Sequence, residues 1–198
     1  GTVDPLVLTL WRFLSGAAVL GTVLLLQRRP VRMKWRSAAP LALMGVLNTF
    51  LSMSLLQLAV KHTTASRAAT NGCSNLVFVT VAASLVGWEK LSGKRILGLL
   101  LGVGGLVLVT GLHTMSVDTG TVYALLASIT FALYMIIGRR ASLKLDPLVI
   151  NTVSFLFGTA ALSGWLLIRG VSLSPQPLFR ELPVFLFMGI GVSGIGYM

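Results

Sequence analysis

Charged residues are scarce in this sequence of 198 residues. Only 11% of them are charged, whereas about a quarter of the residues in a typical soluble domain are charged. Hydrophobic residues make up 55% of the chain, and the mean hydropathy is +0.89. A soluble domain of this size could not bury so much apolar surface. These proportions exclude a soluble globular domain and indicate a membrane protein.

Acidic residues, cysteine and histidine are also rare. The chain has five Asp and Glu residues, two His and the single Cys73, so an intrachain disulfide is excluded. No Cys or His cluster has the spacing of a metal site, and no hydrolase or phosphate-binding motif is found. The sequence therefore predicts no metal, no cofactor and no enzymatic activity.

Long apolar runs dominate the chain instead. A hydrocarbon core of ~30 Å requires roughly 20 apolar helical residues, and seven segments reach or approach this length. Strands are excluded because the runs are long and do not alternate apolar with polar residues. The predicted fold is an all-α polytopic helical bundle with seven spans: Pro5–Gln27, Ala38–Leu58, Ser66–Gly87, Arg95–Leu112, Gly120–Gly138, Pro147–Ile168 and Leu182–Met198.

Basic residues give the chain a net charge of +11, and they gather between the apolar runs. This pattern predicts membrane orientation rather than a nucleic-acid surface. The connectors 28–36, 88–95 and 139–145 lie on one predicted side and hold most of the Lys and Arg, so the positive-inside rule assigns that side to the cytoplasm. Gly1 then lies outside. This favours a chain truncated at both ends, with a complete seven-helix protein as the alternative.

An internal repeat relates the first and sixth predicted spans. Asp4-Pro5-Leu6-Val7 recurs as Asp146-Pro147-Leu148-Val149, and the match continues through Phe13 and Phe155, Gly16 and Gly158, and Leu20 and Leu162. Five spans separate the starts of the two copies, so the copies cross the membrane in opposite directions. Inverted-topology repeats are typical of secondary transporters, because two similar halves can exchange conformations around a central site.

Four segments resemble the EamA-type transporters of the drug/metabolite transporter superfamily. Leu58–Ala69 resembles the junction of the third and fourth helices of that family, and Gly87–Gly98, which contains Glu89, resembles the next junction. The run Gly102–Gly111 resembles its fifth helix, and Arg12-Phe13 resembles an Arg-Phe pair in its second helix. The resemblance implies ten helices in two inverted halves. Residues 1–113 would then be the remainder of the first half, helices two to five, and residues 114–198 the start of the second, helices six to eight.

Polar residues inside the spans are the candidate substrate site. Asn71, Ser74 and Asn75 form one stripe of the fourth family helix, and Asn48 and Ser52 share a face of the third, with Thr49 beside them. A buried amide in lipid requires a polar partner, so these residues face protein or a water-filled cavity. Interhelical hydrogen bonds are the structural alternative. The predicted substrate-binding residues are Asn48, Ser52, Asn71, Ser74, Asn75 and Tyr134.

Two charged residues receive other roles. Arg12 lies inside the first span, where it either anchors the helix near the outer headgroups or attracts an anionic group of a substrate. Glu89 lies in a short basic connector, where a local ion pair or a contact with a helix end is expected. Gly98 and Gly102 form a GxxxG pair. We interpret this pair as packing within one chain, with a homodimer contact as the alternative.

Together these features favour a carrier in the bacterial plasma membrane that exports a small organic solute, such as an amino acid or another metabolite. Two alternatives belong to other classes. One is a non-transporting regulatory membrane subunit, against which the inverted repeat argues. The other is an intramembrane enzyme, for which the spans offer no nucleophile with a base and no metal set.

Overall fold

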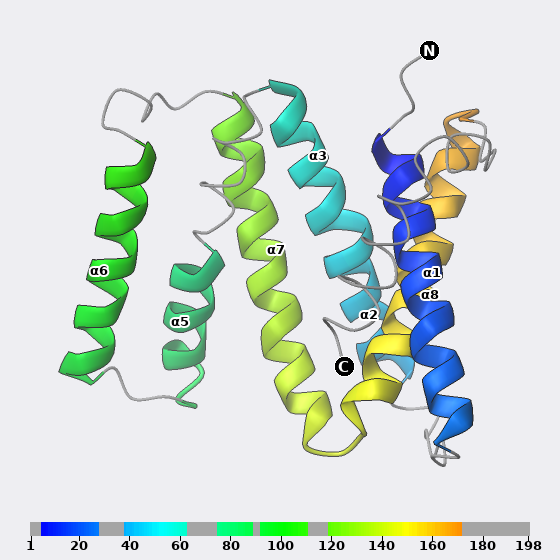
Figure 1. Ribbon diagram of the computed structural model, residues 1–198, viewed down its shortest axis with the longest axis horizontal. Coiled ribbons are helices and arrows are strands. Elements are labelled where there is room, and N and C mark those ends of the chain that lie inside the picture. Colours follow the sequence, from blue (N-terminus) through cyan, green and yellow to red (C-terminus); the bar gives the residue numbers. More distant parts are fainter. Residues whose placement is uncertain (1–4, 28–37, 63–74, 89–91, 111–118, 172–198) are drawn as a thin grey trace. The chain divides into compact units, whose positions relative to one another are not determined.

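The computed structural model describes residues 5–27, 38–62, 75–88, 92–110 and 119–171 (Figure 1). Within these ranges the regular elements are all helical. They are α1 (Pro5–Leu26), α2 (Ala38–Gly45), the π-helix η2 (Val46–Ser52), α3 (Met53–His62), α5 (Asn75–Leu85), α6 (Gly93–Thr110), α7 (Thr119–Ser142) and α8 (Pro147–Ile168). The expectation of an all-α polytopic membrane protein is confirmed.

Four helices are long and apolar enough to cross a membrane: Pro5–Leu26, Ala38–His62, Thr119–Ser142 and Pro147–Ile168. They correspond to four of the seven predicted spans. The described apolar part of α6 covers Ile96–Gly105, and the described part of α5 has 11 residues; both lie within predicted spans. The predicted seventh span, Leu182–Met198, lies outside the described residues.

The chain packs as two compact units. The first unit comprises residues 1–50 and 137–198, and the second comprises residues 51–136. In the first unit α1 and α8 lie side by side and run in opposite directions, and α2 packs against α8 (Figure 1). Because helices in lipid gain little from apolar contact alone, we expect close packing to hold these pairs together.

The ends of α8 follow from local sequence. Asp146 caps its start, where the carboxylate Oδ1 accepts a hydrogen bond of 2.9 Å from the backbone N–H of Leu148. Pro147 then occupies the first helical position, where its missing N–H is no loss. The helix ends at Ile168, and Gly170 follows two residues later with a φ of +68°, which glycine readily adopts. These bounds agree with the predicted span.

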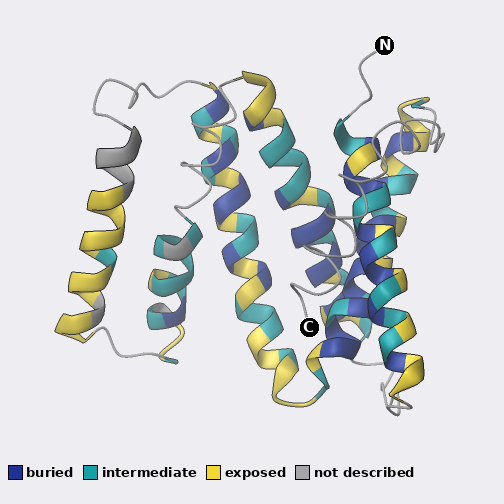
Figure 2. Ribbon diagram, viewed as in Figure 1, coloured by how far each residue is buried: buried dark blue, intermediate teal, exposed yellow. Residues whose placement is uncertain are grey.

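In the second unit α3 packs along α7 through small residues. Ala59 and Ala124 are fully buried against each other, with Tyr123 beside them, and the rings of His62 and Tyr123 are 5.6 Å apart. By contrast, α6 exposes an apolar surface that includes Leu97, Leu100 and Leu101 (Figure 2). An apolar helix surface of this kind suits contact with lipid.

Candidate functional site

A close helix crossing in the first unit joins α2 and α8 through two glycines. A Cβ atom placed on Gly158 would come within 2.5 Å of the Gly45 carbonyl oxygen and of Thr49 Cβ. A Cβ on Gly45 would collide with the carbonyl oxygen of Ser154 and the N–H of Gly158. Because neither position has room for a side chain, the backbones can approach this closely only with glycine at both.

Three buried polar side chains lie at this crossing or one residue from it. Asn48 is 1% exposed, Thr49 is 0% exposed and Ser154 is 1% exposed. Neither amide atom of Asn48 makes a hydrogen bond within the described structure, and the hydroxyls of Thr49 and Ser154 make none either. Trp11, Ser54 and Ser84 also have a buried unpaired atom, but their side chains are only half-buried.

The other hydroxyls of α1 and α8 behave differently. Thr9, Ser15 and Thr22 in α1 each donate to a carbonyl three or four residues earlier in the same helix. Thr152, Thr159 and Ser163 in α8 do the same, with distances of 2.7 to 2.8 Å. This local bond is the usual way for a hydroxyl to be satisfied in an apolar helix. Ser154 departs from that pattern.

Two of the three unpaired residues lie in a π-helical segment of the backbone. Asn48 and Thr49 belong to η2, where the helical hydrogen bonds run from i to i+5 rather than from i to i+4. Short π segments inside α-helices are rare and are frequently found at functional sites. We name Asn48, Thr49 and Ser154 the crossing triad. It contains an amide that can both donate and accept hydrogen bonds, together with two hydroxyls.

The remaining predicted residues occupy different environments. Ser52 is buried, and its hydroxyl donates to the carbonyl oxygen of Ala127 within the second unit at 3.0 Å; its predicted substrate role stays a prediction. Tyr134 is 5% exposed, with its ring 5.6 Å from that of Phe131. Asn75 is half-buried at the start of α5. Asn71, Ser74 and Glu89 lie outside the described residues.

Arg12 is half-buried in α1, and its guanidinium carbon lies 4.7 Å from the centre of the Phe13 ring. This distance is within the range of a cation–π contact. Neither of its two predicted roles is decided by this geometry. Within the described ranges no group of three or more His, Cys, Asp or Glu residues could hold a metal ion.

Sequence reasoning identified only part of the crossing triad. Asn48 is predicted from its amide, and Thr49 lies beside it, whereas the sequence assigns no role to Ser154. The available signal was the pair of glycines Gly16 and Gly158, because a glycine in an apolar helix marks close backbone approach. That signal indicates a crossing on α8 and does not say which hydroxyls lack a partner there.

Four apolar helices that are long enough to span a membrane, two of them an antiparallel pair, define a class: polytopic integral membrane proteins. Comparison with known proteins identifies the family within this class. Residues 1–111 and 118–198 match the EamA-like transporter family. The chain belongs to this family of membrane transporters.

Relatives in several organisms support this assignment. The chain is 30% identical over its whole length to an uncharacterized transporter of Clostridium kluyveri, of which it covers 67%. It is 26% identical to an uncharacterized transporter of Archaeoglobus fulgidus, with 99% of this chain and 69% of the relative covered. A crystal structure matches the whole chain with a TM-score of 0.78, 26% identity and 68% of its own length covered. The chain thus spans about two thirds of the length of these proteins.

Proposed function

We propose that the protein is a secondary transporter that moves a small organic solute across a bacterial plasma membrane by alternating access. The direction we propose is export, and the solute is an amino acid or another polar metabolite. Family membership supports the general activity. The inverted pair α1 and α8 supports the mechanism, because inverted repeats provide two conformations of similar energy around one site.

The crossing triad is the observation that carries the proposal. A buried polar group without a partner costs about 1–3 kcal/mol, and the low-dielectric surroundings of a membrane helix bundle increase that cost. A solute that hydrogen-bonds to Asn48, Thr49 and Ser154 would recover this energy. The triad would therefore replace part of the water that a polar solute loses when it enters the protein.

The test is a substitution that separates binding from stability. In the full-length transporter, Asn48→Leu removes the amide but keeps a similar side-chain volume. Replacing an unpaired polar group by an apolar one of similar shape is neutral or stabilising, so we expect an unchanged or higher thermal unfolding temperature. We expect the apparent affinity for the solute to fall at least several-fold. The measurement is the flux of a panel of radiolabelled amino acids in proteoliposomes, beside thermal unfolding.

The matched control is Thr22→Val on α1. Thr22 is exposed and its hydroxyl donates to the Ala18 carbonyl of its own helix, so flux should stay at the level of the unmodified protein. Normal flux in the Asn48→Leu variant would exclude the crossing triad as the solute site. If no solute in the panel is carried by the unmodified protein, the proposal of amino-acid transport is wrong.

A further inference from the structure

The two repeat copies meet each other directly in the first unit. The copies are offset by 142 residues, as Asp4 and Asp146 show, so Phe13 and Phe155 occupy equivalent positions, which we call mates. Their rings are 4.9 Å apart and stand at 78° in an edge-to-face contact. Both are 0% exposed. A contact between mates can occur only where the two-fold axis that relates the copies passes between them.

Packing continues on both sides of this ring pair. On one side Val7 and Leu10 of α1 form a buried cluster with Leu162 and Leu166 of α8. The mates of these four residues are Val149, Thr152, Leu20 and Leu24, and all of them are buried. A Cβ on Gly21 would lie 3.9 Å from Thr152 Cγ2, which places contact on the second side as well. The helix pair thus has an approximate two-fold symmetry of its own.

Burial along the two helices supports this symmetry. The buried residues of α1 are Val7, Thr9, Leu10, Phe13, Gly16, Ala17, Leu20 and Leu24. Their mates on α8 are buried as well, except the mate of Thr9, Asn151, which is half-buried. Both helices therefore turn the same face inward.

The surroundings of α1 and α8 differ, and this difference breaks the two-fold symmetry of the helix pair. Ile150 is 3% exposed, whereas its mate Leu8 is 38% exposed. Ser154 is buried, whereas its mate Arg12 is half-buried. The extra burial on α8 agrees with the packing of α2, because Gly45 lies against the Ser154 carbonyl. The asymmetry of this conformation lies in the surroundings of the pair and not in the pair itself.

We propose that α1 and α8 keep the same mutual packing in the outward-open and inward-open states, while α2 changes its position relative to them. The inference rests on the proposed transport by alternating access. When two inverted repeats exchange conformations, every contact is replaced by the contact between the mates. A contact between Phe13 and Phe155 is replaced by itself, and the symmetric flanking contacts are replaced by equivalent ones. The covering of α8 by α2 is not matched at Leu8, because Leu8 is exposed whereas its mate Ile150 is buried.

Distance measurements between spin labels test this in the full-length protein with Cys73→Ser. One labelled pair is Leu14→Cys with Leu156→Cys, which are exposed mates next to the ring pair. The matched pair keeps Leu14→Cys and replaces the second position by Leu43→Cys, which is exposed on α2. Pulsed electron paramagnetic resonance in proteoliposomes should give one distance for the first pair, unchanged by saturating radiolabelled amino acid. The second pair should give two distances whose populations shift with the amino acid.

Flux measured on the same labelled samples separates this inference from the proposed function. A first pair that splits into two distances, as far apart as those of the second pair, would overturn the inference. A single distance for both pairs in protein that carries solute would also overturn it, because no movement around α1 and α8 would exist. Two distances for the second pair without any flux would contradict the transport proposal and leave the fixed helix pair intact.

A cross-link provides an independent readout. Phe13→Cys with Phe155→Cys, joined by a short bifunctional thiol reagent, should retain at least half of the flux of the same protein before cross-linking. A loss of flux in proportion to the cross-linked fraction would contradict the fixed pair.

Discussion

Single residues decide how closely the helices of the first unit approach. Gly45 and Gly158 have no space for a side chain, because a Cβ on either would lie 2.5 Å or less from backbone of the other helix. Gly164 is on the same helix as Gly158, and a Cβ there would meet nothing within 4 Å. The two glycines of α8 therefore have opposite expected responses to the same substitution.

We expect Gly158→Ala and Gly45→Ala to lower the thermal unfolding temperature, because α2 and α8 must move apart and lose contact. Overpacking of this kind typically costs about 1–3 kcal/mol. Gly164→Ala should be neutral or should raise stability by up to about 1 kcal/mol, because alanine favours a helix more than glycine does. Differential scanning of the purified variants in detergent gives the comparison. Equal stability of Gly158→Ala and Gly164→Ala would show that the crossing is looser than described.

Individual polar residues show how far sequence reasoning reaches at this scale. Asn48 could be predicted, because an amide inside a span has few acceptable environments. Ser154 and Ser163 look alike in sequence, yet Ser163 donates to the Thr159 carbonyl and Ser154 makes no hydrogen bond within the described structure. Ser52 and Asn48 are predicted to share a helix face, and in the structure the Ser52 hydroxyl donates to the Ala127 carbonyl, whereas neither amide atom of Asn48 makes a hydrogen bond within the described residues. Only the neighbouring helix distinguishes such residues.

Helix ends were better predicted than helix interiors. The start of α8 at Pro147 and its end at Ile168 agree with the predicted span, because Asp-Pro and Gly170 are strong local signals. The π-helix η2 was not predicted, since an apolar run has the same composition in either helical form. The predicted span from Ala38 to Leu58 extends to His62 in the structure. Helix propensity alone could not predict that the helix continues for another turn beyond Leu58.

The cap of α8 gives a prediction at the level of the element. Asp146→Ala removes the acceptor of the Leu148 N–H, and loss of such a cap costs about 1 kcal/mol. Asp146→Asn keeps a capping side chain and is the matched control. We expect thermal unfolding of Asp146→Ala at a lower temperature than that of Asp146→Asn. Identical unfolding of the two variants would mean that the carboxylate bond contributes nothing to stability.

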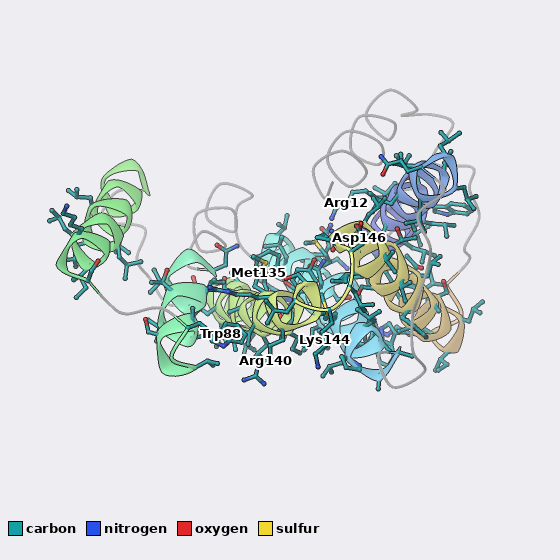
Figure 3. The ribbon with its side chains drawn as sticks, turned by 90° about the horizontal axis from the view of Figure 1, so that it is seen from below. Arg12, Trp88, Met135, Arg140, Lys144 and Asp146 are labelled. Carbon is teal, nitrogen blue, oxygen red and sulfur yellow. The ribbon has the colours of Figure 1, made fainter. Side chains whose placement is uncertain are left out.

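The orientation of the chain in the membrane is a property of the whole molecule. It is a prediction from the distribution of basic residues between the connectors. Arg140 and Lys144 are exposed near the end of α7 and extend away from it, and Asp146 follows at the start of α8 (Figure 3). Thr119, at the other end of this helix, is also exposed. A helix of 24 residues is about 36 Å long and separates its two ends by a full membrane core.

In a Cys73→Ser background, Lys144→Cys should resist an impermeant thiol reagent in intact cells, because the basic side is cytoplasmic. Thr119→Cys should react under the same conditions. Both cysteines should react after the membrane is permeabilised, which verifies that each is accessible. Labelling of Lys144→Cys alone in intact cells would reverse the topology. The predicted boundary between the halves, after residue 113, lies outside the described residues and needs a separate test.

The π-helix has a consequence for chain length in this family. A segment with i to i+5 bonding holds more residues per turn than an α-helix. Such a segment accommodates one extra residue while the flanking α-helices keep their directions. Deleting a single residue between Val46 and Ser52 would therefore return the segment to α-helical bonding with the two flanks nearly unrotated, whereas the same deletion in an α-helical part of Ala38–His62 would rotate one flank by about 100° relative to the other. In this part of the chain, the loss of one residue is therefore less disruptive than in the helices on either side.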